Sequence, residues 1–151
     1  MRIINLQRFA AVDASVGLAA TGAKMEMSVD GTTYTEVAGV NTIPDIGQAP
    51  ETIDVTSLSD TKRKSVAGIA NAQNLAFGVI YKGTNFSSLI AKDGDGVQYS
   101  WRITYPDGMT VTFKGSFALT IQNLAVNGAV TFTITVVVSD GPNYTPAPAE
   151  P

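Results

Sequence analysis

Residues 99–138 read YSWRITYPDGMTVTFKGSFALTIQNLAVNGAVTFTITVVV, and this stretch decides the fold class because apolar and polar residues alternate along it. Such alternation is typical of strands that bury one face. The segment Tyr105–Met109, with Pro-Asp-Gly at its centre, fits a three-residue hairpin loop with a left-handed glycine. That loop predicts three apolar cross-strand pairs: Tyr105 with Met109, Ile103 with Val111, and Trp101 with Phe113.

A second turn signal, Asn127-Gly128, lies farther along the chain and favours a type I′ hairpin. The apolar residues of 109–121 share one parity, so we expect the middle strand to continue through both hairpins with a bend at Gly115. The C-terminal third is therefore predicted to be a three-stranded antiparallel meander. A two-residue loop at the second turn predicts three further pairs: Ile121 with Ile134, Leu119 with Val136, and Phe117 with Val138.

The opposite face of this meander consists mainly of threonine. From Gly115 to Ser139 the chain has no charged residue, although soluble monomers normally place charges on such a surface. The last strand also lacks the lysine, proline or inward charge that usually guards a sheet edge, so we expect it to pair with another subunit. The alternative is that threonine reflects β-propensity alone and that loops cover the edge. The candidate contact residues are Thr110, Thr112, Thr120, Gln122, Thr131, Thr133 and Thr135.

The chain before the meander contains two further strand signals and one helix signal. Alternation predicts a hairpin over residues 24–37 and a strand over Asn74–Tyr81. A short helix follows, capped by Thr84 or Asn85 and closed by Gly94. The apolar face of this helix is expected to carry Phe86, Leu89 and Ile90.

Two long connections, Ala38–Glu51 and Ser57–Ala72, flank a predicted short strand at Thr52–Val55. Loops longer than about 12–15 residues usually carry a function, so both connections are candidate contact loops. The fold class expected from these signals is mainly β with one short α-helix. The expected organisation is an N-terminal arm (1–23), one β domain (24–140) and a flexible C-terminal tail (141–151).

The composition excludes several classes of function. The 151 residues include no histidine and no cysteine, which removes histidine-based or thiolate catalysis and histidine- or cysteine-held metals. The net charge of −3 argues against a protein that grips nucleic acid by its phosphates. Apolar runs are too short for a membrane span. We therefore expect no enzyme activity, no cofactor and no membrane insertion.

Two acidic motifs are also weak candidates for chemistry. Asp93–Gly96 begins like a calcium loop, but the twelfth position of that loop is Thr104 and not glutamate. A turn that leads from the helix into the next strand explains this segment better. Asp54 and Asp60 are a conceivable carboxylate pair, yet nothing in the sequence brings them together.

Three segments, Asn41–Gly47, Pro50–Asp60 and Val66–Ile69, resemble the major tail tube proteins of long-tailed, siphovirus-type bacteriophages. The strand with Phe77 and Tyr81 agrees with that pattern, and the resemblance covers residues 24–140. It implies a small β-sandwich or half-barrel with one helix. It also implies hexameric rings that stack into a hollow tube, through which viral DNA passes without specific binding.

The resemblance further implies where contacts and partners lie. The long loop within Ala38–Ala72 would reach the next ring, so ring stacking maps to Pro44, Asp45, Lys62, Arg63 and Lys64. The basic triplet alone is also consistent with phosphate contact. Expected partners are further copies of the chain, the tape measure, the tail terminator and the distal tail protein. The expected location is the tail of the virion, after synthesis in the cytoplasm of the host bacterium.

A channel that conducts DNA should not bind it tightly, so its lining should be neutral or acidic. The threonine-rich face fits a lumen in this respect. Arg102 and Lys114 on the same face would then pair with acidic residues of an adjacent subunit, or the face would instead contact the helix or a neighbouring subunit. Two alternatives stay open. One is a tube protein of a contractile tail or bacterial secretion system. The other is an immunoglobulin-like or carbohydrate-binding module, although the aromatics Trp101 and Phe113 are predicted to be buried.

Overall fold

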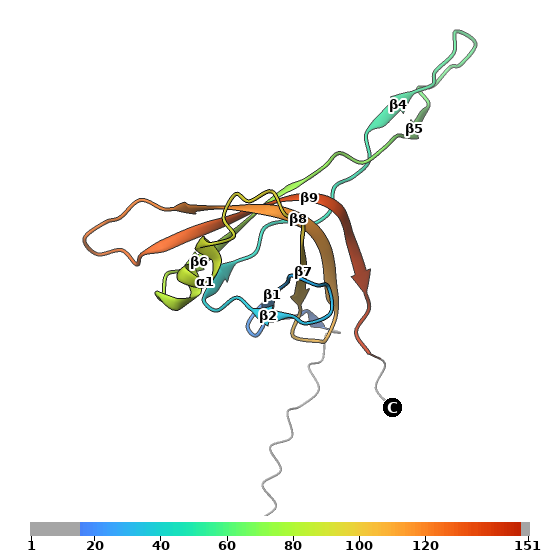
Figure 1. Ribbon diagram of the computed structural model, residues 1–151. Helices are drawn as coiled ribbons and strands as arrows, with labels where there is room; N and C mark the ends of the chain where they lie inside the picture. The colour runs from blue at the N-terminus through green and yellow to red at the C-terminus, as the bar shows by residue number, and fades with distance from the viewer. Residues whose placement is uncertain (1–15, 149–151) are drawn as a thin grey trace, which may run out of the picture.

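The computed structural model describes residues 16–148. Within this range the chain forms a curled antiparallel sheet of seven strands, one helix, and a separate two-stranded hairpin that projects from the body (Figure 1). The strand order of the main sheet is β2-β1-β7-β8-β9-β6-β3. The elements are β1 (Lys24–Ser28), β2 (Thr35–Glu36), β3 (Val40–Thr42), β4 (Thr52–Asp54), β5 (Ser65–Ala67), β6 (Asn74–Ile80), α1 (Thr84–Ile90), β7 (Tyr99–Thr104), β8 (Thr110–Ile121) and β9 (Thr131–Thr145).

The two longest strands, β8 and β9, curve together and give the sheet its half-barrel shape (Figure 1). The first half of β8 pairs with β7, whereas the first half of β9 pairs with β6. The predicted bend at Gly115 is confirmed, because the β8–β9 register shifts between Lys114 and Gly115. A β carbon on Gly115 would lie 2.3 Å from the carbonyl oxygen of Val137, so only glycine fits where the strands are this close. The mainly β fold predicted from the sequence is therefore observed, and the sheet has the half-barrel form, one of the two forms that the resemblance implied.

The hydrophobic core lies on the concave side of the sheet, with α1 packed over it. Trp101 is completely buried, and its Nε1 donates a 3.1 Å hydrogen bond to the carbonyl of Gly115. From the helix, Leu89 is buried, and Phe86 packs edge-on against Phe132 with ring centroids 5.1 Å apart. Trp101 and Phe113 are therefore buried, as predicted from the sequence.

The helix differs from its prediction at both its cap and its buried face. Gly83 occupies the N-cap position without a side-chain hydrogen bond. The Asn85 side chain is buried instead, and it donates hydrogen bonds to the carbonyls of Ala38 (2.7 Å) and Ile80 (2.8 Å). Asn85 therefore ties the helix to β6 and to the residues before β3, while Ile90, which was expected to be buried, is half exposed.

The predicted β7–β8 hairpin is confirmed in full, whereas the register of the β8–β9 hairpin differs from the prediction. The β7–β8 register pairs Trp101 with Phe113 and Ile103 with Val111, as predicted. In the β8–β9 hairpin the observed pairs are Phe117 with Val136, Leu119 with Ile134 and Ile121 with Phe132. The turn centres one residue earlier than Asn127-Gly128, because Gly128 donates its N–H to Ala125 and has no positive φ. The shift of two residues preserves parity, so the same side chains stay on the core face, although Ile121 at the end of β8 is exposed.

The boundaries of the β domain also differ from those predicted. Strand β9 continues to Thr145, whose partner is Thr110, so residues 141–145 belong to the sheet and not to a tail. Their pairing with β8 explains why this segment is ordered despite its proline and glycine. Of the predicted N-terminal arm, residues 1–15 lie outside the described range, as do residues 149–151 of the predicted tail.

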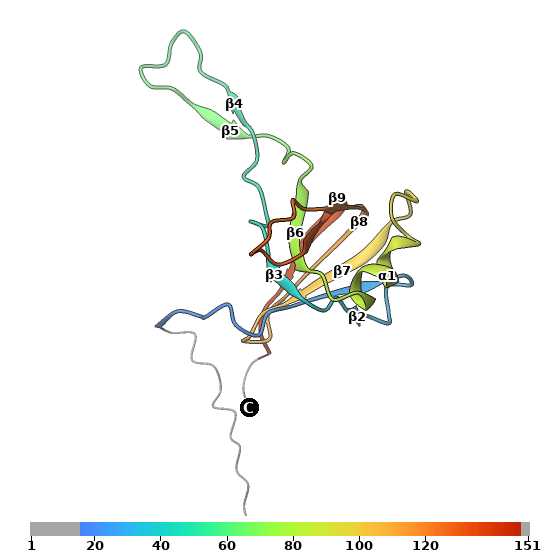
Figure 2. The same cartoon turned by 90° about the vertical axis from the view of Figure 1, so that its left-hand side faces the viewer.

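The two long connections contain short strands that the sequence did not indicate. Strand β3 lies within Ala38–Glu51 and forms one edge of the sheet, next to β6. Strand β5 lies within Ser57–Ala72 and pairs only with β4. We call residues 52–67 the arm, because Figures 1 and 2 both show this hairpin projecting away from the body.

Candidate assembly surfaces

The arm exposes a row of apolar side chains that no other part of the described chain covers. Leu58 at its tip is fully exposed, and four other apolar residues of the arm and its base are about half exposed or more. Contiguous exposed apolar surface is typical of a protein–protein contact. These four residues are Ile53, Val55, Val66 and Ile69.

The tip of the arm is held in one shape by hydrogen bonds around Asp60. Its carboxylate accepts hydrogen bonds from the N–H (2.8 Å) and the hydroxyl (2.9 Å) of Ser57, and it forms an ion pair with Lys64. Lys64, followed by Ser57, lowers the pKa of Asp60, so this carboxylate stays ionised at neutral pH. The backbone N–H of Lys64 also donates to Thr56 Oγ1 (2.9 Å). The tip is therefore preorganised for contact.

The five residues predicted to stack rings do not form one site. Lys62, Arg63 and Lys64 lie in the tip loop of the arm. Asp45, which follows Pro44, lies against the body, because its carbonyl accepts a 2.7 Å hydrogen bond from Gln73 Nε2. Lys64 is paired with Asp60 within the chain, whereas Lys62 and Arg63 make no ion pair among residues 16–148.

The predicted contact residues of the meander divide into two groups at the bend. Thr110 and Thr112 lie before Gly115, where they pair with Thr104 and Arg102 of β7. The others lie beyond the bend, on the convex side of the β8–β9–β6 part of the sheet. We call this second group the threonine face, and it comprises Thr120, Gln122, Thr131, Thr133 and Thr135.

Small uncharged residues complete the threonine face. Thr135 lies between Ala118 and Ala76, and Thr133 lies between Thr120 and Gly78. Sequence analysis missed the contribution of β6, although the alternation along that strand already placed Ala76 and Gly78 opposite its buried residues. The face is therefore uncharged across three strands and consists mainly of small side chains.

The charges on the convex side lie away from this face. Arg102 forms an ion pair with Glu26 on β1, and its guanidinium lies 4.1 Å from the centre of the Tyr34 ring. The expectation that Arg102 pairs with an adjacent subunit is therefore wrong, since its partner is in the same chain. Lys114 is exposed and lies at the bend.

The expected unguarded edge is not where the sequence placed it. Strand β9 lies between β8 and β6, and the edges of the sheet are the short strands β2 and β3. Pairing of β6 ends near Val138, whose N–H donates to Gln73, so within residues 16–148 the second half of β9 has no strand on that side. Along β9, only residues 139–145 are therefore open to a further strand on that side.

The acidic motifs have structural roles in the described chain. Asp95 accepts a 2.6 Å hydrogen bond from the Tyr99 hydroxyl, which raises the pKa of Tyr99 to about 12 and lowers the pKa of Asp95. Asp93 accepts the N–H of Leu119 (2.8 Å). These contacts confirm that residues 93–96 lead the helix into β7. Residues 16–148 contain no cluster of three potential metal ligands and no helix long and apolar enough to cross a bilayer.

Comparison with known proteins gives a family and a fold. Residues 9–147 match the family model described as phage tail tube protein, TTP. Comparison with curated proteins gave no significant match.

Two solved structures share the fold at low sequence identity. One is a chain in the tail of an empty GTA particle, refined with helical and C6 symmetry. It has a TM-score of 0.63 and 19% identity, and the match covers 85% of this chain and 100% of that chain. The other is a chain in the 6-fold symmetrised baseplate of the anti-feeding prophage. It has a TM-score of 0.55 and 9% identity, with 78% and 89% covered. Because the family model spans nearly the whole chain, the protein belongs to the phage tail tube protein family and has a structural role in a phage tail.

Proposed function

We propose that six copies of this chain form a ring, that the rings stack into the tube of a long, non-contractile tail, and that the threonine face lines the lumen. The observation that carries this proposal is the uncharged surface of mainly small side chains that β8, β9 and β6 form together. A lining without fixed cations gives the phosphates of a passing DNA no site at which to bind. The fold likeness to a C6-symmetric tail supports the same arrangement.

The arm is proposed to contact the neighbouring ring. Its preorganised tip, its uncovered apolar side chains and the cations Lys62 and Arg63 suit it to bind another subunit. Lys64 supports the tip by its pairing with Asp60, and Pro44 and Asp45 would position the base of the arm. Tape measure, tail terminator and distal tail protein are the other expected partners, and the tube would be part of the virion after synthesis in the host cytoplasm.

Electron microscopy of the purified protein tests this function directly. We expect a concentration series in negative stain to show rings or hollow tubes of uniform diameter, with light scattering reporting multiples of the subunit mass. A monomer that persists at every concentration, including after addition of preformed tail ends, would contradict the proposed tube.

Two substitutions test the threonine face. Thr133→Lys and Thr135→Lys each place six like charges per ring on one lining, where mutual repulsion opposes closure. We expect folded monomers that do not form tubes. Ser87→Lys, on the exposed surface of α1, adds the same charge elsewhere and should leave tubes intact. Normal tubes from both threonine variants would show that this face does not line a closed ring.

A further inference from the structure

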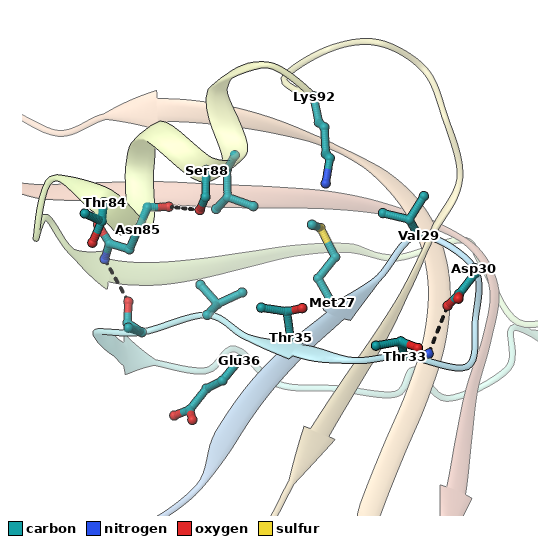
Figure 3. A pocket seen from close by; sticks show the side chains of 13 residues that line it. Met27, Val29, Asp30, Thr33, Thr35, Glu36, Thr84, Asn85, Ser88 and Lys92 are labelled. Carbon is teal, nitrogen blue, oxygen red and sulfur yellow. Dashed lines mark hydrogen bonds between the residues drawn. The ribbon is translucent and has the colours of Figure 1, made fainter.

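A cavity of about 650 Å³ opens between α1 and the β1–β2 hairpin, and no contact described so far uses it (Figure 3). Its floor is apolar and is formed by Met27, Val37 and Leu89, all of which are buried. Small or polar residues, including Thr35 and Ser88, form its walls. A cavity of this size and polarity accepts several apolar side chains.

The rim of this cavity carries a carboxylate, Asp30, that makes no ion pair among the described residues. Asp30 accepts hydrogen bonds from the N–H groups of Thr32 and Thr33, both at 2.9 Å, and these bonds lower its pKa. Glu36 on β2 is not part of this charge, because it pairs with Glu26 and its side chain points away from the cavity (Figure 3). Lys92 is the cation of the rim, and Asp95 and the Tyr99 ring, 5.9 Å from its Nζ, both face it. Asp30 therefore favours a cationic occupant.

The tip of the arm has the complementary properties. Leu58 and Val55 offer apolar side chains to the floor, and Lys62 and Arg63 offer cations to the rim. The hydrogen bonds around Asp60 hold the tip in shape before contact, which reduces the entropy lost on docking.

The arm cannot fill the cavity of its own chain. In both Figure 1 and Figure 2 the arm projects from one end of the body, whereas α1 and β2 lie at the other end. A contact between opposite ends is heterologous, so it joins subunits head to tail and can repeat without limit.

We infer that the tip of the arm docks in the cavity between α1 and the β1–β2 hairpin of a second copy of this chain, with Leu58 as its apolar anchor. This inference rests on the proposed function and adds to it the site that receives the arm. It commits to self-association, because the complementary surfaces are both present on this one chain.

Cross-linking between two single-cysteine variants tests the docking, since the natural chain contains no cysteine. Leu58→Cys protein is mixed with Ser88→Cys protein under assembly conditions and treated with a short bis-maleimide. The matched control uses Ser87→Cys protein in place of the Ser88→Cys protein. Ser87 lies next to Ser88 on α1 but does not line the cavity. We expect about tenfold more heterodimer with Ser88→Cys, because docking raises the local concentration of the pair.

The outcomes separate the docking from the tube. A strong preference for Ser88→Cys supports the docking. Equal or absent cross-linking in samples that contain tubes overturns the docking and leaves the tube standing. Absence of both tubes and heterodimer overturns both proposals.

Neutralising the carboxylate at the rim provides a second test. Asp30→Asn, which keeps the Oδ1 that accepts from Thr32 and Thr33, should reduce the Leu58→Cys to Ser88→Cys heterodimer severalfold. An unchanged yield of heterodimer would overturn the role of this carboxylate in the contact.

Discussion

Gly115 is the residue on which the curvature of the sheet depends. It interrupts β8 at the register shift, its carbonyl accepts the indole hydrogen bond of Trp101, and its missing side chain leaves room for β9. The sequence indicated a bend here because a glycine interrupts the alternation. The indole hydrogen bond to its carbonyl carried no sequence signal, since it depends on the bend itself.

Gly115→Ala should destabilise the monomer by about 1–3 kcal/mol, because the new methyl group would overlap the Val137 carbonyl and the Val136 side chain. Urea unfolding at low protein concentration measures this loss. Ala118→Val, on the exposed side of the same strand, is the control and should change stability by less than about 0.5 kcal/mol. Equal effects of the two substitutions would mean that β9 does not approach Gly115 this closely.

Tyr99 makes stability sensitive to alkaline pH. Its pKa is raised from 10.0 to about 12 by the hydrogen bond to Asp95, so the folded state holds this proton more tightly than the unfolded state does. The resulting stabilisation is fully present below pH 10 and is lost as the pH rises from 10 toward 12. Tyr99→Phe should therefore show a shallower loss of stability over this range, measured by urea unfolding. Tyr144→Phe, which replaces an exposed tyrosine, should keep the steep profile.

Single elements show which features the sequence could and could not predict. The β7–β8 hairpin was predicted in register, because its loop sequence permits one turn geometry and both faces agree with it. The predicted β8–β9 register is wrong by two residues. Alternation determines which face each side chain occupies, but a shift of two residues keeps every side chain on the same face, so alternation cannot distinguish the two registers. Strand β5 was missed because its three exposed residues, Ser65–Ala67, bury no face and show no alternation of burial.

The separation of the predicted ring-stacking residues has a similar cause. Pro44 and Lys62 lie in the two successive connections Ala38–Glu51 and Ser57–Ala72, but pairing of β4 with β5 projects the second connection into an arm. Pairing between two three-residue strands is a tertiary event without a local signal, so the sequence could not place Pro44 near the body and Lys62 at a distant tip.

The arm should be dispensable for folding and necessary for assembly. Leu58→Asp should leave the free energy of unfolding within about 0.5 kcal/mol, because the side chain is fully exposed. The same change should raise the protein concentration needed for tubes by about tenfold, since a buried contact between copies loses its apolar anchor. Thr61→Asp adds the same charge to the same loop and should assemble normally. Assembly of Leu58→Asp at the normal concentration would show that the tip makes no contact in the tube.

The whole molecule has two different ends: the arm projects from one end, and the cavity proposed to receive an arm lies at the other. Each subunit therefore offers two different surfaces to its neighbours (Figure 2). Growth through such surfaces is directional. A subunit that retains only one of them can join an assembly and then stop it.

Leu58→Asp protein should therefore shorten tubes when it is mixed as a minor component with the natural protein. Its cavity still receives an arm, but its own tip cannot dock. Tube lengths in electron micrographs measure the effect. The double variant Leu58→Asp with Ser88→Trp, whose cavity is also filled, should leave the lengths unchanged. Equal shortening by both variants would contradict directional growth through these two surfaces.

The exposed tip of the arm has one more consequence, which concerns proteolysis. Lys62, Arg63 and Lys64 are three consecutive trypsin sites in a loop that the rest of the described chain leaves uncovered, whereas Arg102 lies within a paired strand. Free subunits should be cut first at this loop and keep an otherwise intact body. Docked subunits should be protected there, so the fraction of chains that survive brief digestion would report, without any label, how much of the protein has assembled.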